Sequence, residues 1–210
     1  MRPHLFGALL CAALGFTTPA LATTISLSSV SSDATPASQL GADFDFSVSG
    51  STLTLTVTNT GSSFNITEVY FNGSTSVTSL SLVTATHNVQ GDVFAVWSPV
   101  EPNSMADGFG AFDFALTDGV GETNVNLIEP NENVIFTFAI TGAGGYTDAD
   151  FIVGNANGYQ AAAKFTNGGD DPETPEEDDD DSAFGAVPEP AAGWLLGAGL
   201  LLIAARKPLA

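Results

Sequence analysis

The chain has 210 residues, with four Lys or Arg against 24 Asp or Glu, which gives a formal net charge of −20 at pH 7. Three of the four basic residues lie near the chain ends, at Arg2, Arg206 and Lys207, so Lys164 is the only one between them. Binding to nucleic acid and binding of the body to an anionic lipid surface both need clustered Lys or Arg, so the composition excludes both classes.

Residues 1–22 have the organisation of a secretory signal peptide. Arg2 gives a basic start, residues 5–16 form an apolar core, and Ala20 and Ala22 occupy the small-residue positions of a cleavage site. We expect a signal helix that signal peptidase removes after Ala22, which leaves Thr23 as the first residue of the mature chain. The apolar core is shorter than the roughly 20 residues that a membrane-spanning helix needs.

Cys11 is the only cysteine of the chain, and it lies within this apolar core. A lipoprotein site requires a small residue before the cysteine, whereas Leu10 stands there. We therefore expect Cys11 to leave with the signal peptide. A mature chain without cysteine excludes disulfides, a thiol nucleophile, a Cys-ligated metal and a redox motif.

Residues 23–169 predict one all-β domain, a single antiparallel β-sandwich with a jelly-roll-like arrangement as the nearest variant. Apolar and polar residues alternate with a period of two over residues 44–48, 53–57, 112–116 and 134–140. Gly50 and Ser51 predict the turn of a hairpin between the first two runs. The further strands expected are residues 24–30, 64–71, 77–84, 93–97, 151–153 and 161–165.

Few residues of this domain suggest catalysis. His87 is the only histidine after the signal, and no Gly-x-Ser-x-Gly motif accompanies it, so we interpret it as a polar residue beside a turn. A glycosidase needs two carboxylates that flank the scissile bond, and the candidates are Asp43, Asp45, Glu68, Asp113 and the 148–150 pair. Each lies on the outward phase of a strand or in a turn, which favours solvated acids and a protein that is not an enzyme.

The best metal candidates are oxygen ligands for calcium, because carboxylate and amide oxygens are what this ion prefers. Asp148, Asp150, Asn155 and Asn157 are closely spaced in one segment. They do not match the EF-hand pattern, and such residues also build turns without a metal. The turn interpretation is favoured, and we expect no other cofactor.

Two further patterns suggest binding surfaces. Thr52, Thr54, Thr56, Thr58 and Thr60 alternate along one strand, as in an ice-binding face, although threonine is also common on the wet face of any sheet. Aromatic residues could instead form a sugar-stacking platform of a carbohydrate-binding module; the candidates are Tyr70, Trp97, Tyr146 and Tyr159.

Residues 170–186 predict a disordered acidic linker. Residues 170–181 are all acidic apart from Pro172, Thr174 and Pro175. A block of like charges without counter-charge repels itself and stays extended and solvated. We expect this linker to separate the body from a membrane anchor.

The last segment, residues 187–210, has three parts in a fixed order. Val187, Pro188, Glu189 and Pro190 precede an apolar run over 191–205, and Arg206 and Lys207 follow it. This order resembles the PEP-CTERM sorting signal of exported bacterial proteins. The resemblance implies a C-terminal transmembrane helix in the precursor, with an exosortase as the processing partner. A buried core helix and an ordinary tail anchor are the alternatives.

These observations predict an exported, non-catalytic cell-surface or extracellular-matrix protein, anchored in the membrane as a precursor. Biofilm exopolysaccharide is the expected partner outside the cell. The alternatives are a carbohydrate-binding module and, behind it, an ice-binding surface or a glycoside hydrolase.

Overall fold

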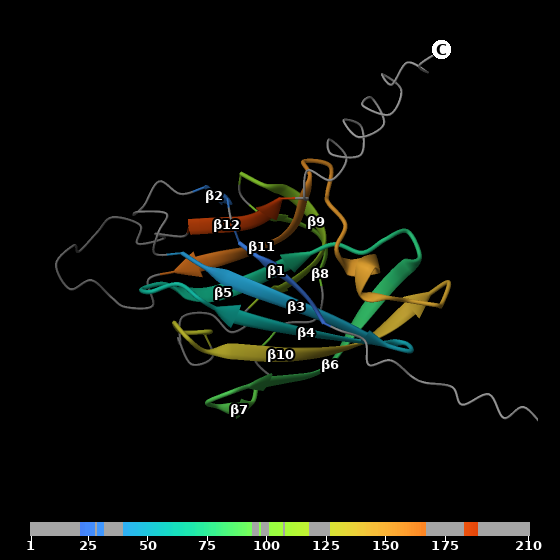
Figure 1. The fold of residues 1–210 in the computed structure, drawn as a ribbon, viewed down its shortest axis with the longest axis horizontal. Helices are drawn as coiled ribbons and strands as arrows, with labels where there is room; N and C mark the ends of the chain where they lie inside the picture. Colours follow the sequence, from blue (N-terminus) through green and yellow to red (C-terminus); the bar gives the residue numbers. More distant parts are fainter. Residues whose placement is uncertain are drawn as a thin grey trace, which may run out of the picture.

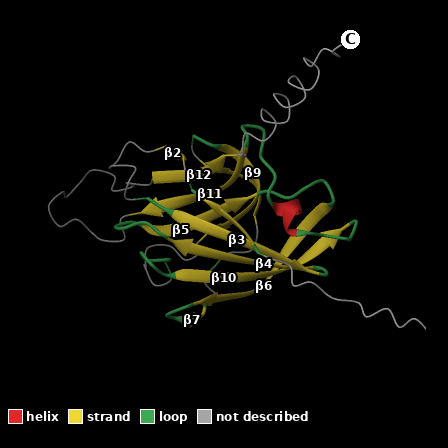
Figure 2. Ribbon diagram, in the orientation of Figure 1, coloured by secondary structure: helices red, strands yellow, loops and turns green. Residues whose placement is uncertain are grey.

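The computed structural model describes residues 22–27, 29–31, 40–93, 97, 101–106, 108–117, 127–166 and 183–188. They form strands and one short 3-10 helix, η2, at Asp148–Phe151 (Figures 1 and 2). The strands are β1 (Thr23–Ser26), β2 (Ser29–Ser31), β3 (Ala42–Ser49), β4 (Thr52–Asn59), β5 (Asn65–Phe71), β6 (Val77–His87), β7 (Gly91–Asp92), β8 (Glu101–Ala106), β9 (Gly110–Thr117), β10 (Asn133–Gly142), β11 (Tyr159–Thr166) and β12 (Ala183–Pro188).

The strands form two 6-stranded antiparallel sheets. Sheet A has the order β1-β3-β4-β10-β6-β7, and sheet B has the order β2-β12-β11-β5-β9-β8. The hairpin expected at Gly50 is confirmed, because β3 pairs with β4 across that turn. Gly50 has a φ of 62°, a left-handed conformation that glycine adopts without a steric penalty.

The two sheets pack face to face on one hydrophobic core. Along β3 and β4 the apolar residues are buried and the polar residues between them are less buried, as the alternation predicts. In β10 every second residue from Val134 to Ile140 is buried, whereas Ile135 and Ala139 are exposed. The ring of Phe71 in sheet B lies 6.0 Å from the ring of Phe46 and 5.8 Å from that of Phe138, both in sheet A. These contacts hold the sheets together, since aromatic rings bury more apolar surface than other side chains. The expected all-β fold of antiparallel sheets is confirmed.

Most expected strands lie close to their predicted positions. The runs at 64–71 and 77–84 correspond to β5 and β6, and the short run at 161–165 corresponds to β11. β11 lies inside sheet B and is buried on both faces, because Ala161 and Ala163 face the shared core and Ala162 packs in a second apolar cluster. A strand buried on both faces shows no alternation, which explains the faint pattern.

The single strand expected at 24–30 is wrong, because the chain changes sheets within it. β1 pairs with β3 in sheet A, whereas β2 pairs with β12 in sheet B. A switch between sheets needs only a local bend, which the alternation of side chains does not reveal.

The strand expected at 151–153 is also wrong. Phe151 is fully buried, but it ends the helix η2 rather than beginning a strand. A capping box explains the helix, since Thr147 and Asp150 reciprocally bond each other's side chain and backbone groups. Of residues 93–97, Val93 and Trp97 are outside the strands, and 94–96 lie outside the described residues.

Three strands were not anticipated from the sequence. β7 has only two residues and pairs with the end of β6. β8 contains Pro102 and forms an edge of sheet B, the place in a sheet where proline is tolerated. β12 pairs with β11 and covers residues on both sides of the boundary drawn between 186 and 187. The domain therefore extends beyond residue 169.

The signal helix and the C-terminal transmembrane helix were expected in segments that lie outside the described residues. Within the described part of the chain, no helix is long and apolar enough to span a membrane.

Candidate functional site

The first candidate site is the predicted signal-peptidase cut. Ala22 is exposed and lies directly before β1, and Thr23 is the first residue of that strand, paired with Phe46. Ala20 lies outside the described residues. A cut after Ala22 would therefore remove no residue of sheet A.

The second candidate site is the start of the sorting motif. Pro188 pairs with Tyr159 at the end of β12, and Val187 pairs with Ala161. Proline has no backbone N–H to continue a ladder, which suits the last position of a strand. Glu189, Pro190, Arg206 and Lys207 lie outside the described residues. The motif therefore begins inside β12, the last described strand along the chain, without a spacer between them.

The position of β12 shows that the acidic run connects two strands of the same sheet. Phe165 of β11 is paired with Ala183 of β12, so the residues between the two strands begin and end at neighbouring points of sheet B. The acidic run at 170–181 belongs to this connection between two antiparallel strands. The sequence had instead suggested a spacer between the body and a membrane anchor.

Of the calcium candidates, Asp148 and Asp150 make hydrogen bonds that hold η2 against its neighbours. Asp148 Oδ1 accepts from the backbone N–H of Val48, at 2.6 Å. Asp150 Oδ1 accepts from the hydroxyls of Ser74 and Ser76, at 2.6 and 2.9 Å. These bonds connect η2 to β3 and to the turn before β6.

The other two candidates, Asn155 and Asn157, build a separate turn. Asn155 Oδ1 accepts from the N–H groups of Asn157 and Tyr159, each at 3.0 Å. Both asparagine side chains donate to the carbonyl oxygen of Phe109, at 2.9 and 3.2 Å. The structure thus divides the four residues between two hydrogen-bonded groups, each with a structural role.

We expect Asp150→Ala to lower the free energy of unfolding by about 1 kcal/mol at pH 7, because it removes a helix cap. The hydroxyl of Ser74 and then the N–H of Thr147 lower the pKa of Asp150 below its ordinary value of 3.8. A carboxyl with a lowered folded-state pKa contributes stability above its unfolded pKa and loses it as the pH falls through the folded value.

The difference between wild type and Asp150→Ala should therefore be full at pH 5–7 and shrink below about pH 4. Urea unfolding at pH 7, 5 and 3 measures it. If the difference in unfolding free energy stays constant down to pH 3, the negative charge of Asp150 does not contribute to the stability of the fold.

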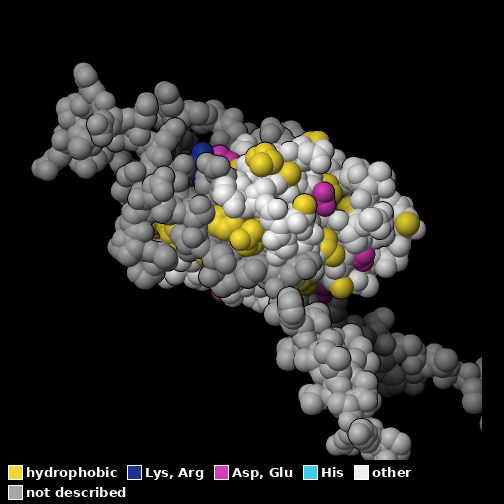
Figure 3. Space-filling view, turned by 90° about the horizontal axis from the view of Figure 1, so that it is seen from above, with side chains coloured by type: hydrophobic (Ala, Val, Ile, Leu, Met, Phe, Trp, Pro, Cys, Tyr) yellow, Lys and Arg dark blue, Asp and Glu magenta, His cyan; other side chains and the backbone are white. Residues whose placement is uncertain are grey.

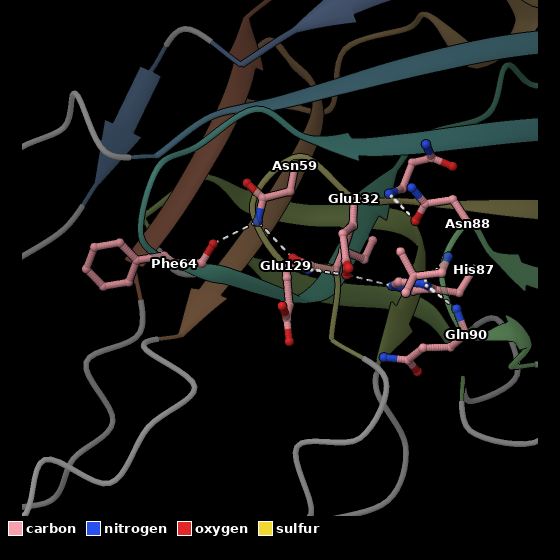
Figure 4. A network of polar contacts seen from close by, with 10 residues as sticks. Asn59, Phe64, His87, Asn88, Gln90, Glu129 and Glu132 are labelled. Carbon is pink, nitrogen blue, oxygen red and sulfur yellow. Dashed lines mark hydrogen bonds and ion pairs between the residues drawn. The ribbon is translucent and has the colours of Figure 1, made fainter.

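His87 is buried at the end of β6, where the chain turns toward β7 (Figure 4). Its Nδ1 accepts from the N–H groups of Val89 and Gln90, at 3.1 and 3.2 Å. The ring proton is therefore on Nε2, which lies 3.2 Å from Glu132 Oε2 without hydrogen-bond geometry. With the lone pair of Nδ1 occupied by the turn, this geometry does not suit a general base.

Asn59 lies at the same end of the sandwich as the polar contacts around His87 (Figure 4). It is fully buried, and its Nδ2 donates to the carbonyls of Phe64 and Ile128, at 2.7 and 2.8 Å. Its Oδ1 accepts from the N–H of Gly61, at 2.9 Å. A buried amide with these partners satisfies backbone groups that would otherwise be unpaired. The alternating run over residues 53–57 ends two residues before Asn59 and does not indicate this role.

Among the carboxylates considered for a glycosidase dyad, Asp45, Glu68 and Asp113 each have a different partner. Asp45 accepts from the hydroxyl of Thr24 on the outer face of sheet A. Glu68 Oε1 of β5 lies 3.1 Å from Lys164 Nζ of β11. Lys164 is the only Lys or Arg of the described residues, so it accounts for the blue atoms of Figure 3, which lie beside magenta atoms of an acidic residue. Asp113 accepts from the N–H of Gly73 at 3.1 Å. Among the described residues, no group of three or more His, Cys, Asp or Glu is placed to hold a metal ion.

The aromatic candidates do not form an exposed row. Trp97 and Tyr70 are each only 3% exposed. The ring of Trp97 packs edge-on against Phe136 in the core at 5.0 Å, while Tyr70 lies in the second cluster beside Phe112. Tyr146 packs against the main core and Tyr159 against the second cluster. A stacking platform needs exposed ring faces, which Trp97 and Tyr70 do not offer.

The threonine face is wider than the sequence indicated. Thr54 of β4 is paired with Thr137 of β10, which is paired with Thr84 of β6. Ser47 of β3 pairs with Thr54 on its other side. Hydroxyl side chains therefore continue across four neighbouring strands on the outer face of sheet A, a continuity that needs the strand register and is not visible in one strand.

No family model, curated protein or solved structure matches this chain.

Proposed function

We propose that the chain is an exported, non-catalytic cell-surface or extracellular-matrix protein, whose body is displayed after both ends have been processed. The observation that carries the proposal is where the two predicted processing sites fall. Thr23 begins β1, and Pro188 ends β12. Cuts after Ala22 and beyond Pro188 would leave both sheets whole.

The tail supplies the sorting part of the proposal. Pro188-Glu189-Pro190, the apolar run 191–205 and the pair Arg206-Lys207 resemble the PEP-CTERM signal, with an exosortase as the processing enzyme. Positive residues stay on the cytoplasmic side of a membrane, so the body of the anchored precursor would face outward.

The chemistry of the described side chains supports a role without catalysis. His87 uses Nδ1 for a turn, and Glu68 lies in an ion pair with Lys164. A glycosidase acid pair instead needs two carboxylates facing one substrate bond. The acidic surface keeps such a domain soluble outside the cell, because like-charged molecules repel one another.

Exopolysaccharide stays the expected partner in the matrix. The outer face of sheet A offers hydroxyl donors and acceptors rather than aromatic platforms, with Thr54, Thr84 and Thr137 in one row. Hydroxyl groups both donate and accept hydrogen bonds, as sugar hydroxyls do. A carbohydrate-binding module built on stacked aromatic rings is the less favoured alternative.

The test is the mass and location of the exported protein in its native host. We expect cell-surface and matrix fractions to contain a chain that begins at Thr23 and lacks the tail. Glu189→Ala should retain the tail and remain with the membrane, because it alters the recognised motif. Glu173→Ala, the same change within the acidic run, should be processed like wild type. A wild-type matrix protein that ends at Ala210 would contradict the proposal.

A further inference from the structure

The outer edge of β6 differs from the other sheet edges of the described structure. β7 pairs with β6 only at Thr86 and His87, and the N–H of Val93 then bonds Ala85. The chain turns away at that point, since the N–H of Trp97 bonds the carbonyl of Val93 and its ring enters the core. No described strand lies along the outer edge of residues 77–84.

Exposed edges attract other strands, because their N–H and C=O groups are unpaired, and proteins protect them with shortness, charge or proline. The other edge strands show such features. β1 and β2 have only 4 and 3 residues, and β8 contains Glu101 and Pro102. β6 has 11 residues and neither a charged residue nor a proline. Two register shifts, at Thr78 and at Val83, leave the four residues between them, 79–82, in regular pairing with β10.

The side chains of this edge are also apolar on one face. Leu80 and Leu82 are partly buried and pack against the main core, whereas Ser79 and Ser81, which alternate with them, are exposed. Val83 beside them is 52% exposed. A strand added along this edge would cover the two leucines and continue the core.

We propose that this edge of β6 pairs with β6 of a second copy of the chain, in a two-fold symmetric antiparallel arrangement. An antiparallel pair centred on Ser81 places Leu80 opposite Leu82 of the other copy, Ser81 opposite the other Ser81, and Ser79 opposite Val83. Charge opposes association over the acidic surfaces but not at this edge. Two chains of net charge −20 repel each other over acidic surfaces, but residues 77–87 carry no Asp or Glu. The pair joins two sheets A into one continuous sheet.

Sedimentation velocity of the purified full chain over a range of concentrations tests this pairing. We expect a reversible dimer that strengthens as salt rises, because salt screens the repulsion between the acidic bodies. Ser81→Asp should weaken the dimer about tenfold or more, since it brings two carboxylates together at the symmetry axis.

The matched control is Ser62→Asp, the same change at an exposed residue between β4 and β5; it should dimerise like wild type. Ser79→Asp is a second edge variant, and circular dichroism of all three variants reports whether the fold is intact.

A wild-type chain that stays monomeric at all concentrations would overturn the proposal. So would a dimer that Ser81→Asp and Ser79→Asp leave unchanged, or one that Ser62→Asp weakens equally. If only an extended peptide, and no second copy, occupies the edge, the wild type also stays monomeric and the proposal fails.

Discussion

Replacing Phe138 with Ala is expected to lower the free energy of unfolding by about 3–5 kcal/mol. Phe138 is fully buried in β10, and its ring lies 5.8 Å from Phe71 and 6.3 Å from Phe136. Removing it leaves a cavity between two sheets whose backbones are fixed by their ladders, so the space does not close. Total stabilities of domains are only about 5–15 kcal/mol. Urea unfolding followed by circular dichroism measures the loss.

Thr137→Ala is the matched control, because Thr137 is the preceding residue of the same strand and faces outward. It should change the free energy of unfolding by less than about 1 kcal/mol. An equal loss in the two variants would contradict the inward position of Phe138 and, with it, the packing of the two sheets.

The sequence predicted the parts of the fold where one face of a strand is dry and the other is wet. In β3 and β4 the alternation of Phe44, Phe46, Leu53 and Leu55 with polar residues matches the observed burial. Side chains alternate between the faces of a strand, so these runs reveal both the strand and its inner face. The same alternation located β9 and β10.

The sequence did not predict features that depend on pairing between distant residues. β12 follows an acidic run and has no alternation that distinguishes it, yet it fits between β2 and β11. The break between β1 and β2 likewise depends on distant partners, because β1 pairs with β3 in sheet A and β2 pairs with β12 in sheet B. Phe151 would be buried in either a strand or a helix, so its hydrophobicity does not distinguish the two. The hydrogen bonds between Asp150 and Thr147 stabilise the helix.

The same limit applies to the candidate site residues. Asp148, Asp150, Asn155 and Asn157 were singled out because their oxygens are close in sequence, but each oxygen's role is set by its neighbours in space. Ser74 is distant in sequence from Asp150, and Phe109 is distant from Asn155. The burial of Trp97 and Tyr70 also follows from packing rather than from composition. The hydrophobic pattern marks an inner face, but it does not distinguish a buried aromatic residue from an exposed one in a loop.

The strand β12 leads to the second large effect, which concerns where the folded domain ends. β11 is paired with β5 on one side and with β12 on the other, and β2 is paired with β12. A chain that stops after residue 169 lacks β12, so an inner strand becomes an edge and β2 loses its only pairing in the described sheet.

We expect the chain that stops after residue 169 to be less stable than one that stops after Pro190 by several kcal/mol. Each backbone hydrogen bond lost contributes about 0.5–1.5 kcal/mol, and β12 pairs with six positions of β11, from Tyr159 to Phe165. Urea unfolding of the two shortened chains measures the difference.

The full chain is the control, and it should unfold at the same midpoint as the chain that ends at Pro190, because both retain β12. Equal midpoints for the two shortened chains would show that β12 does not stabilise the domain, and the acidic run would then be a spacer as the sequence suggested. If the difference is found, a sorting cut must fall beyond Pro188, because a cut before β12 would release a destabilised domain.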